Sequence, residues 1–164
     1  MAYAERVDAQ FAFKEVYLGW LWFSLEFGNN PEELARLEKC KWRTGELVFN
    51  EVQRKLDIPP GNPFTVAKSI GDYLTRVGYA KFQFMKVSDD EIVCDKTDLV
   101  VAPIMPLVRS LGIKVSPQPS DTLFAAALKR LCNMKAESVP LPEHLKASTP
   151  KGWEREMWRF SPLS

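Results

Sequence analysis

The spacing of apolar residues predicts three helices in the first half of the chain. Large apolar side chains dominate residues 4–28, and Gly28 can adopt the left-handed conformation that commonly ends a helix. Asn30 and Asn62 each precede a proline, a typical helix start, because the asparagine side chain caps free backbone N–H groups and proline fits the first turn. Apolar residues then recur at steps of three and four. We expect helices over residues 4–28, 31–57 and 63–77.

After Gly78 the apolar residues alternate with polar ones, which is the pattern of a strand with one buried face. Residues 81–87 and 91–95 flank Ser-Asp-Asp, a turn sequence, and therefore predict an antiparallel hairpin. This order of elements predicts an α+β fold, with N-terminal helices packed on a small, mostly antiparallel sheet and with further helices. The later elements that we expect are an irregular helix from residue 97 or 98 to 111, a strand over 113–115, a helix from 120 or 121 to about 134, a short strand near Val139, a proline-marked loop, and a last strand over 153–160.

Composition and charge indicate one ordinary globular domain. The 164 residues are 46% hydrophobic, and 22 Lys and Arg balance 21 Asp and Glu, so the basic excess of nucleic-acid-binding domains is missing. We expect a single domain over residues 1–164, with a helical part at 1–78 and a mixed part at 79–164. The apolar stretch Val16–Phe27 has 12 residues, fewer than the roughly 18 that a membrane span needs. With three widely spaced cysteines and no signal-peptide pattern, a cytoplasmic protein is expected.

Several common chemistries lack the residues they need. No two of the 8 glycines lie closer than seven residues, so the phosphate-binding motifs GxGxxG and GxxxxGK[ST] are absent. The GxSxG motif of serine hydrolases is absent too. His144 is the one histidine, which excludes a metal site built on two histidines. We expect no metal and no cofactor.

Aromatic residues in the first two predicted helices are the strongest candidates for a binding site. Glu26 follows Trp22 by one helical turn, so its carboxyl could lie against the rings and anchor a polar group of a ligand. Alternatively, Glu26 faces solvent or pairs with a basic residue, and the rings form the core or a dimer interface. The ligand-binding candidates are Trp20, Trp22, Phe23, Glu26 and Trp42.

Catalytic candidates are fewer. Cys94 is followed by Asp95 and then by Lys96, and a reactive thiolate needs a neighbouring cation or helix N-terminus. An inert buried thiol is the alternative for Cys94, and a solvated loop residue is the alternative for His144. The candidate catalytic residues are Cys94, Asp95, Glu26 and His144.

The run Gly19–Gly28, followed by Pro31, Leu34, Trp42 and Gly45, resembles bacterial and archaeal proteins similar to L-2-amino-thiazoline-4-carboxylic acid hydrolase. The later order of helix, hairpin ending in a cysteine, helix and strands is similar to hydrocarbon-binding domains of the vinyl-reductase type. This resemblance implies an α+β domain, often dimeric, with a pocket between helices and sheet for a small, largely apolar molecule. No cysteine follows Cys132, so the resemblance does not extend to the cysteine-rich C-terminal strand of that type or to its metal chemistry.

Three functions therefore compete. The first is a binding module for a small apolar or aromatic molecule, and the second is a hydrolase or lyase acting on a small thiazoline-like or aromatic substrate. The third is an accessory subunit of a larger enzyme assembly. The apolar run Leu18–Phe27 carries more bulky surface than one helix normally covers, which predicts a homodimer or a heteromeric partner.

Overall fold

The computed structural model describes residues 19, 26, 30–100, 102, 106, 110 and 119–163. The chain divides into two compact units, one of residues 1–41 and 100–116 and the other of residues 42–99 and 117–164. This division falls inside the second helix rather than near residue 78, where the sequence pattern changes. Gly19 and Glu26 are helical, but the rest of the predicted helix over 4–28 lies outside the described residues. The predicted strand over 113–115 and most of the helix before it also lie outside them.

The described elements confirm the α+β class. The sheet has four strands in the order β1-β2-β4-β3, and every neighbouring pair is antiparallel. None of the described helices is long and apolar enough to cross a membrane. The elements are α2 (Pro31–Lys55), α3 (Pro63–Arg76), β1 (Lys81–Lys86), β2 (Glu91–Thr97), α5 (Pro119–Cys132), β3 (Met134–Val139), α6 (Glu143–Ala147) and β4 (Glu154–Pro162).

The predicted starts of α2 and α3 are confirmed in atomic detail. The Asn30 side chain accepts a hydrogen bond from the backbone N–H of Glu32 at 3.1 Å, and the Asn62 side chain accepts one from Thr65 at 3.1 Å. The hairpin and the last strand are also confirmed. The expected strand near Val139 is confirmed as β3, which begins earlier than its centre suggested, at Met134, and the proline-marked loop contains the short helix α6, which was not expected.

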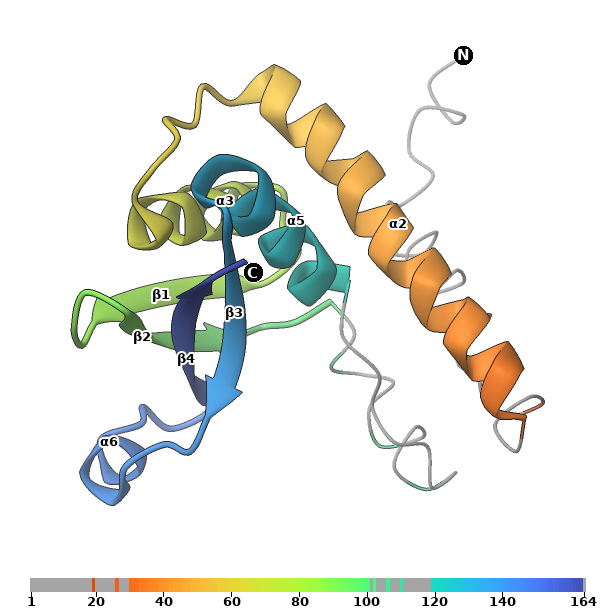
Figure 1. Cartoon of the computed structure of the whole chain (residues 1–164). Helices are drawn as coiled ribbons and strands as arrows, with labels where there is room; N and C mark the ends of the chain where they lie inside the picture. Colours follow the sequence, from red (N-terminus) through yellow and green to blue (C-terminus); the bar gives the residue numbers. More distant parts are fainter. Residues whose placement is uncertain are drawn as a thin grey trace, which may run out of the picture. The chain divides into compact units, whose positions relative to one another are not determined.

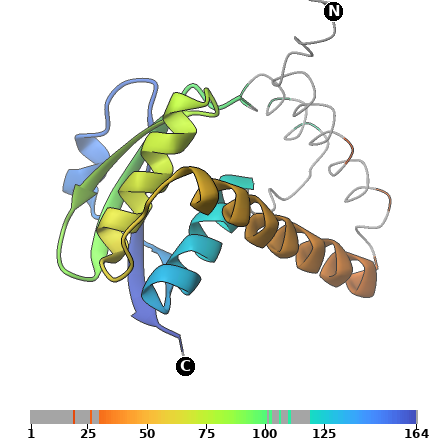
Figure 2. The same ribbon diagram turned by 90° about the horizontal axis from the view of Figure 1, so that it is seen from above.

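One face of the sheet forms the core of the second unit. Figures 1 and 2 show α3 and α5 lying side by side on this face. The Phe124 ring of α5 lies edge-on to Phe82 at 5.6 Å and to Trp158 at 5.2 Å, measured between ring centroids. Such edge-to-face pairs add stability beyond the burial of their area. The other buried residues of the sheet and the two helices include Val66, Ile70, Leu74, Ile92, Leu123, Leu128 and Phe160.

Two glycines allow close packing around this core. A Cβ atom at Gly45 of α2 would lie 2.5 Å from the backbone oxygen of Thr122 in α5, so the two helices approach too closely for any larger residue. A Cβ atom at Gly71 of α3 would lie 2.3 Å from the Phe84 ring of β1. Both positions therefore fix where a helix meets its neighbour.

The opposite face of the sheet carries a buried ion pair. Arg155 of β4 donates to both carboxylate oxygens of Asp95 in β2, at 2.6 and 2.7 Å, and both side chains are about nine-tenths buried. The same guanidinium donates to the backbone oxygen of Leu145 in α6 and to the Ser148 hydroxyl, each at 2.8 Å. These bonds hold the connection between β3 and β4 against the sheet.

Candidate functional site

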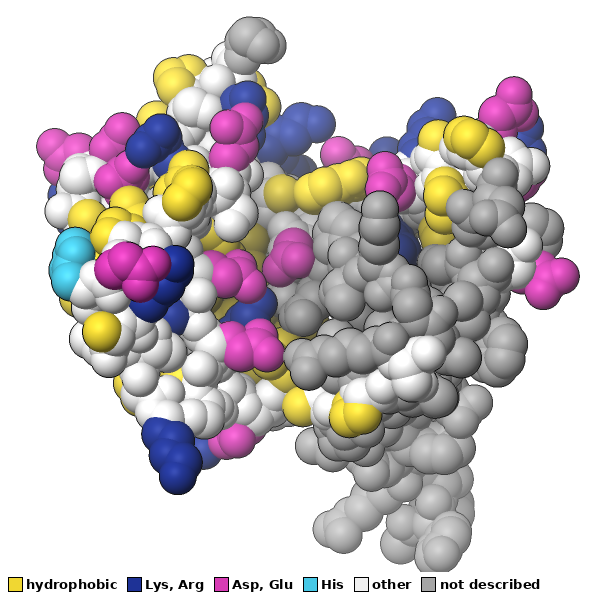
Figure 3. Space-filling view, turned by 90° about the horizontal axis from the view of Figure 1, so that it is seen from below, with side chains coloured by type: hydrophobic (Ala, Val, Ile, Leu, Met, Phe, Trp, Pro, Cys, Tyr) yellow, Lys and Arg dark blue, Asp and Glu magenta, His cyan; other side chains and the backbone are white. Residues whose placement is uncertain are grey.

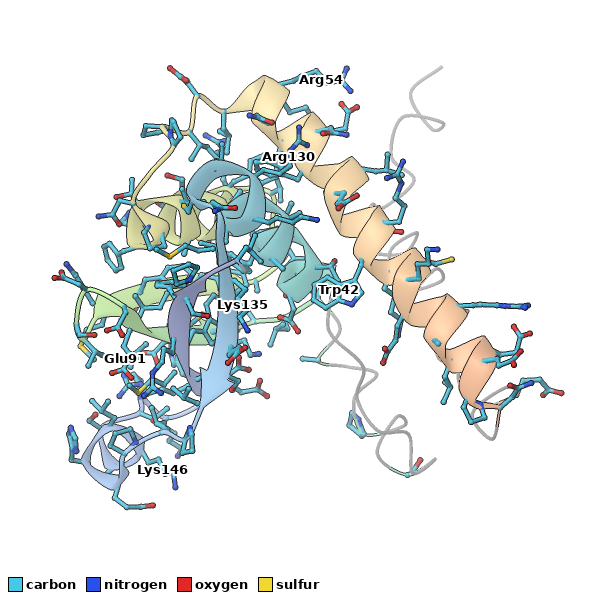
Figure 4. All side chains as sticks on the ribbon, in the orientation of Figure 1. Trp42, Arg54, Glu91, Arg130, Lys135 and Lys146 are labelled. Atoms are coloured by element: carbon cyan, nitrogen blue, oxygen red, sulfur yellow. The ribbon has the colours of Figure 1, made fainter. Side chains whose placement is uncertain are left out.

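An open groove in the second unit lies beside Trp42, between α5 and the strands β3 and β4. It consists of two adjoining hollows of about 220 and 300 Å³, which share Trp42, Ala125 and Ala136 as lining residues. Figure 4 shows Trp42 pointing from α2 toward the N-terminal end of α5. Trp42 is 44% exposed, and the small alanine side chains leave space next to its ring. The groove is therefore a recess whose wall includes a partly exposed indole ring.

The first hollow combines aromatic rings with carboxylates. Its rings come from three separate elements, namely α2, α5 and β4, and its two acids come from the first turn of α5 and from β4. Mostly apolar walls with a few placed polar groups are typical of small-molecule sites. The lining residues are Trp42, Asp121, Phe124, Ala125, Ala136, Ser138, Glu156 and Trp158.

A buried lysine and an indole hold the carboxylate of Glu156 in place. The Lys96 side chain is 8% exposed, and its ammonium donates a hydrogen bond to one carboxylate oxygen of Glu156. The Trp158 indole N–H donates to the other oxygen at 3.1 Å. Burial by itself lowers the pKa of Lys96, but the hydrogen bond to Glu156 and the carboxylates of Glu156, Asp121 and Glu154 outweigh it and raise that pKa. Lys96 is therefore a charged partner of Glu156 and is not a neutral amine nucleophile.

The second hollow has a more even balance of charge. Lys129 lies 3.6 Å from a carboxylate oxygen of Glu46, and both residues line the hollow. Lys135 also lines it and bonds to Glu137 of the same strand at 2.5 Å. The apolar part of this wall comes from Ala125, Ala126, Met134, Ala136 and Leu163, together with Trp42.

Of the five predicted ligand-binding residues, Trp42 alone falls within the described groove. Trp20, Trp22 and Phe23 lie outside the described residues. Glu26 is helical and exposed, and the rings against which its carboxyl was expected to lie are outside the described residues.

The predicted catalytic residues of the second unit are not brought together. Cys94 is 1% exposed on the helix-covered face of β2, and its burial, aided by Glu156, raises the pKa of the thiol. Asp95 points to the other face, where Arg155 binds it. His144 lies on α6 and is exposed, as the cyan side chain in Figure 3 shows. This arrangement provides neither a thiolate nor a base beside one.

Sequence reasoning missed the other aromatic and acidic residues of the first hollow, which are Asp121, Phe124, Glu156 and Trp158. A signal for two of them was present, because Glu154, Glu156 and Trp158 alternate along the last predicted strand and must share one face. The convergence of α5 and β4 on Trp42 depends on contacts between residues more than 75 positions apart, which no local pattern reveals.

The described residues contain no cluster of three or more His, Cys, Asp or Glu side chains that could hold a metal ion. The chemistry of the groove is thus that of rings and oriented carboxylates, which can bind a ligand but include no activated nucleophile. Among known proteins, no family model matches the chain, and no curated protein matches it significantly.

Proposed function

We propose that this protein is a small-molecule-binding domain, and that the groove beside Trp42 receives a ligand with an aromatic or apolar body. The observation that carries this proposal is the recess of about 220 Å³ in which three aromatic rings meet two carboxylates. Rings supply affinity through buried apolar area, and a few polar groups fix the orientation of the ligand.

The construction of the groove supports binding more than catalysis. Glu156 receives two hydrogen bonds from Lys96 and Trp158, so its carboxylate is oriented before any ligand arrives. Such preorganisation lowers the entropic cost of binding. Cys94 of β2 lies opposite Glu156 of β4, but its side chain is buried and its pKa is raised. It therefore does not supply the thiolate that the hydrolase hypothesis requires.

The binding proposal can be tested with 2-phenylethanol, an uncharged aromatic probe, by following backbone amide shifts in a two-dimensional NMR titration. We expect the shifts to cluster on α5, β3 and the segment of α2 around Trp42. Ala136 lines both hollows, so the larger side chain of Ala136→Leu would occupy the space where the probe binds. This variant should weaken binding at least about tenfold, which corresponds to roughly 1.4 kcal/mol.

The matched control is Ala147→Leu, which adds the same side chain at an exposed alanine of α6. This variant should bind the probe like the unmodified protein. Shifts confined to other surfaces, or binding unchanged in Ala136→Leu, would refute the proposed function.

The partner expected from Leu18–Phe27, a homodimer or a heteromeric contact, is a separate proposal. That run lies almost wholly outside the described residues. Sedimentation at micromolar concentration tests it, because a clean monomer near 18.7 kDa would contradict self-association.

A further inference from the structure

We infer that the outer edge of β3 pairs with the same edge of a second copy of this chain, so that two sheets of four strands join into one continuous antiparallel sheet. This inference does not depend on the proposed function. It follows from the direction of the backbone groups of β3, from the charges on its exposed face, and from the symmetry that pairing between identical strands requires.

β3 is an edge strand in which alternate residues turn their backbone groups away from the sheet. β4 lies on one side of it, and no described strand lies on the other. The backbone N–H of Leu163, just after β4, donates to the backbone oxygen of Asn133, just before β3, at 3.0 Å. Because hydrogen-bonded and non-hydrogen-bonded pairs alternate along an antiparallel ladder, every second residue of β3 counted from Asn133 bonds to β4. The residues between them direct their N–H and C=O groups outward, and they are Met134, Ala136 and Ser138.

This outer edge of β3 is open to another strand. Among the described residues, no hydrogen bond reaches its outward backbone groups. The opposite edge of the sheet differs, because the N–H of Phe82 in β1 donates to the Thr75 hydroxyl of α3 at 3.1 Å. β3 also lacks the proline and the bulge with which many natural edge strands avoid pairing. The edge at β3 is therefore the one that can accept a further strand.

The charges of Lys135 and Glu137 select one register for pairing between two copies. Outward residues must face outward residues, so the two-fold axis passes beside a residue and not between two residues. An axis at Lys135 would place two lysines opposite each other, and an axis at Glu137 would place two glutamates so. An axis at Ala136 instead places Lys135 of each copy opposite Glu137 of the other. These are non-hydrogen-bonded pairs, in which the side chains lie closest.

The charges that meet in this register are exposed, and they extend a row of charges that already crosses the sheet. The side chains of Lys135 and Glu137 are 51% and 60% exposed, and their bond of 2.5 Å within the strand leaves further donors and acceptors on both. On the same face, Arg159 of β4 lies opposite Glu137 and donates to Glu91 of β2 at 2.6 Å. Charges along the row then alternate in sign across both copies. This complementarity identifies the occupant of the edge as a second copy of the chain.

Charge reversals in the full chain test this pairing by sedimentation velocity at high micromolar concentration. The unmodified protein should form a reversible dimer of twice 18.7 kDa, which is weak because one pair of six-residue strands is a small interface. Lys135→Glu and Glu137→Lys each place like charges opposite each other twice per dimer, and each should raise the dissociation constant at least about tenfold. Mixed in equal amounts, the two variants should associate with each other, because each then faces the opposite charge.

Two further measurements complete the test. Lys68→Glu reverses an exposed lysine of α3 and should leave the dimer unchanged. In the unmodified protein, the outward amide of Ala136 should exchange its hydrogen more slowly in concentrated than in dilute solution. The amide of Lys135, which is directed to β4, should change little. Thermal unfolding of each variant establishes that it is folded before its association is compared.

The outcomes that would overturn the inference are distinct. A monomer at every concentration would refute it and leave the edge to a strand of another protein. A dimer that neither reversal weakens would refute it in favour of another surface, such as the run Leu18–Phe27. Two folded variants that fail to associate when mixed would refute the register. If a variant does not fold, hydrogen exchange decides, because an Ala136 amide that exchanges equally fast at all concentrations contradicts the pairing.

Discussion

At the scale of single residues, the Arg155 side chain joins two other parts of the second unit to β4. It holds the Asp95 carboxylate by two bonds and the connection containing α6 by two more. Because both charged groups are about nine-tenths buried, each depends on the other for the stabilisation that water would otherwise provide. Asp95, a catalytic candidate in the sequence, is thus accounted for as a structural partner.

We predict that Arg155→Met lowers the free energy of unfolding by about 3–5 kcal/mol, since it leaves a buried carboxylate without its counterion. The double variant Asp95→Asn with Arg155→Met should recover part of this loss, because no buried charge then remains. Urea unfolding measures both effects. A double variant as unstable as the sum of its single variants would show that the two residues act independently.

At the scale of helices and strands, the close approach of α2 and α5 at Gly45 decides whether Trp42 can reach the groove. The Gly45 backbone faces Thr122, one turn along α2 from Trp42, and no Cβ atom fits between them. A glycine inside a helix costs about 1 kcal/mol relative to alanine. The close approach of α2 to α5, which leaves no room for a Cβ atom, accounts for a glycine at this position.

We predict that Gly45→Ala destabilises the protein by about 1–3 kcal/mol although alanine favours the helical conformation, because the added methyl group forces α2 away from α5. It should also weaken the binding of aromatic probes, since Trp42 would move with the helix. Gly19→Ala is a suitable control: Gly19 is helical, and no described atom lies within 4 Å of a Cβ built there. In that variant the same substitution should be neutral or stabilising. A Gly45→Ala protein as stable as the unmodified one would contradict the packing argument.

Elements with strong local signals were predictable, and those with weak ones were not. Asparagine-proline starts located α2 and α3, and the change of period after Gly78 located β1 and β2. The start of β3 was missed although Asn133 ends α5 in the left-handed conformation, with φ 54°, a position that asparagine tolerates well. The five-residue helix α6 is too short for its apolar residues to show a helical period.

At the scale of the whole molecule, the groove was less predictable than the fold because it is made by tertiary contacts. Trp42 was a candidate from its chemistry alone, but its neighbours come from α5 and β4. The ion pair between Lys96 and Glu156 joins residues 60 positions apart, and hydrophobic periodicity carries no information about such a pair. The pattern could assign a residue to a face of a strand but not to a site shared with a helix.

The buried thiol of Cys94 makes the stability of the whole molecule depend on pH. In the folded protein its pKa is raised by burial and by Glu156, so the thiol keeps its proton at alkaline pH. In the unfolded chain a cysteine ionises near pH 8.5. Above that pH the unfolded state therefore binds fewer protons than the folded state, and stability falls as the pH rises. Lys96 does not oppose this trend up to about pH 10, since its pKa is raised and it stays charged in the folded state.

We predict that the free energy of unfolding falls between about pH 7 and pH 10, and that this one thiol accounts for roughly 2 kcal/mol of the loss. Cys94→Ala should be less stable at neutral pH, because it leaves a small cavity, but its stability should fall less steeply with pH. Cys40→Ala removes an exposed thiol and should keep the slope of the unmodified protein. Cys132 is present in all three proteins, so its contribution cancels. Urea unfolding under reducing conditions at several pH values gives the slopes, and identical slopes for Cys94→Ala and the unmodified protein would show that the thiol is not protected from ionisation by folding.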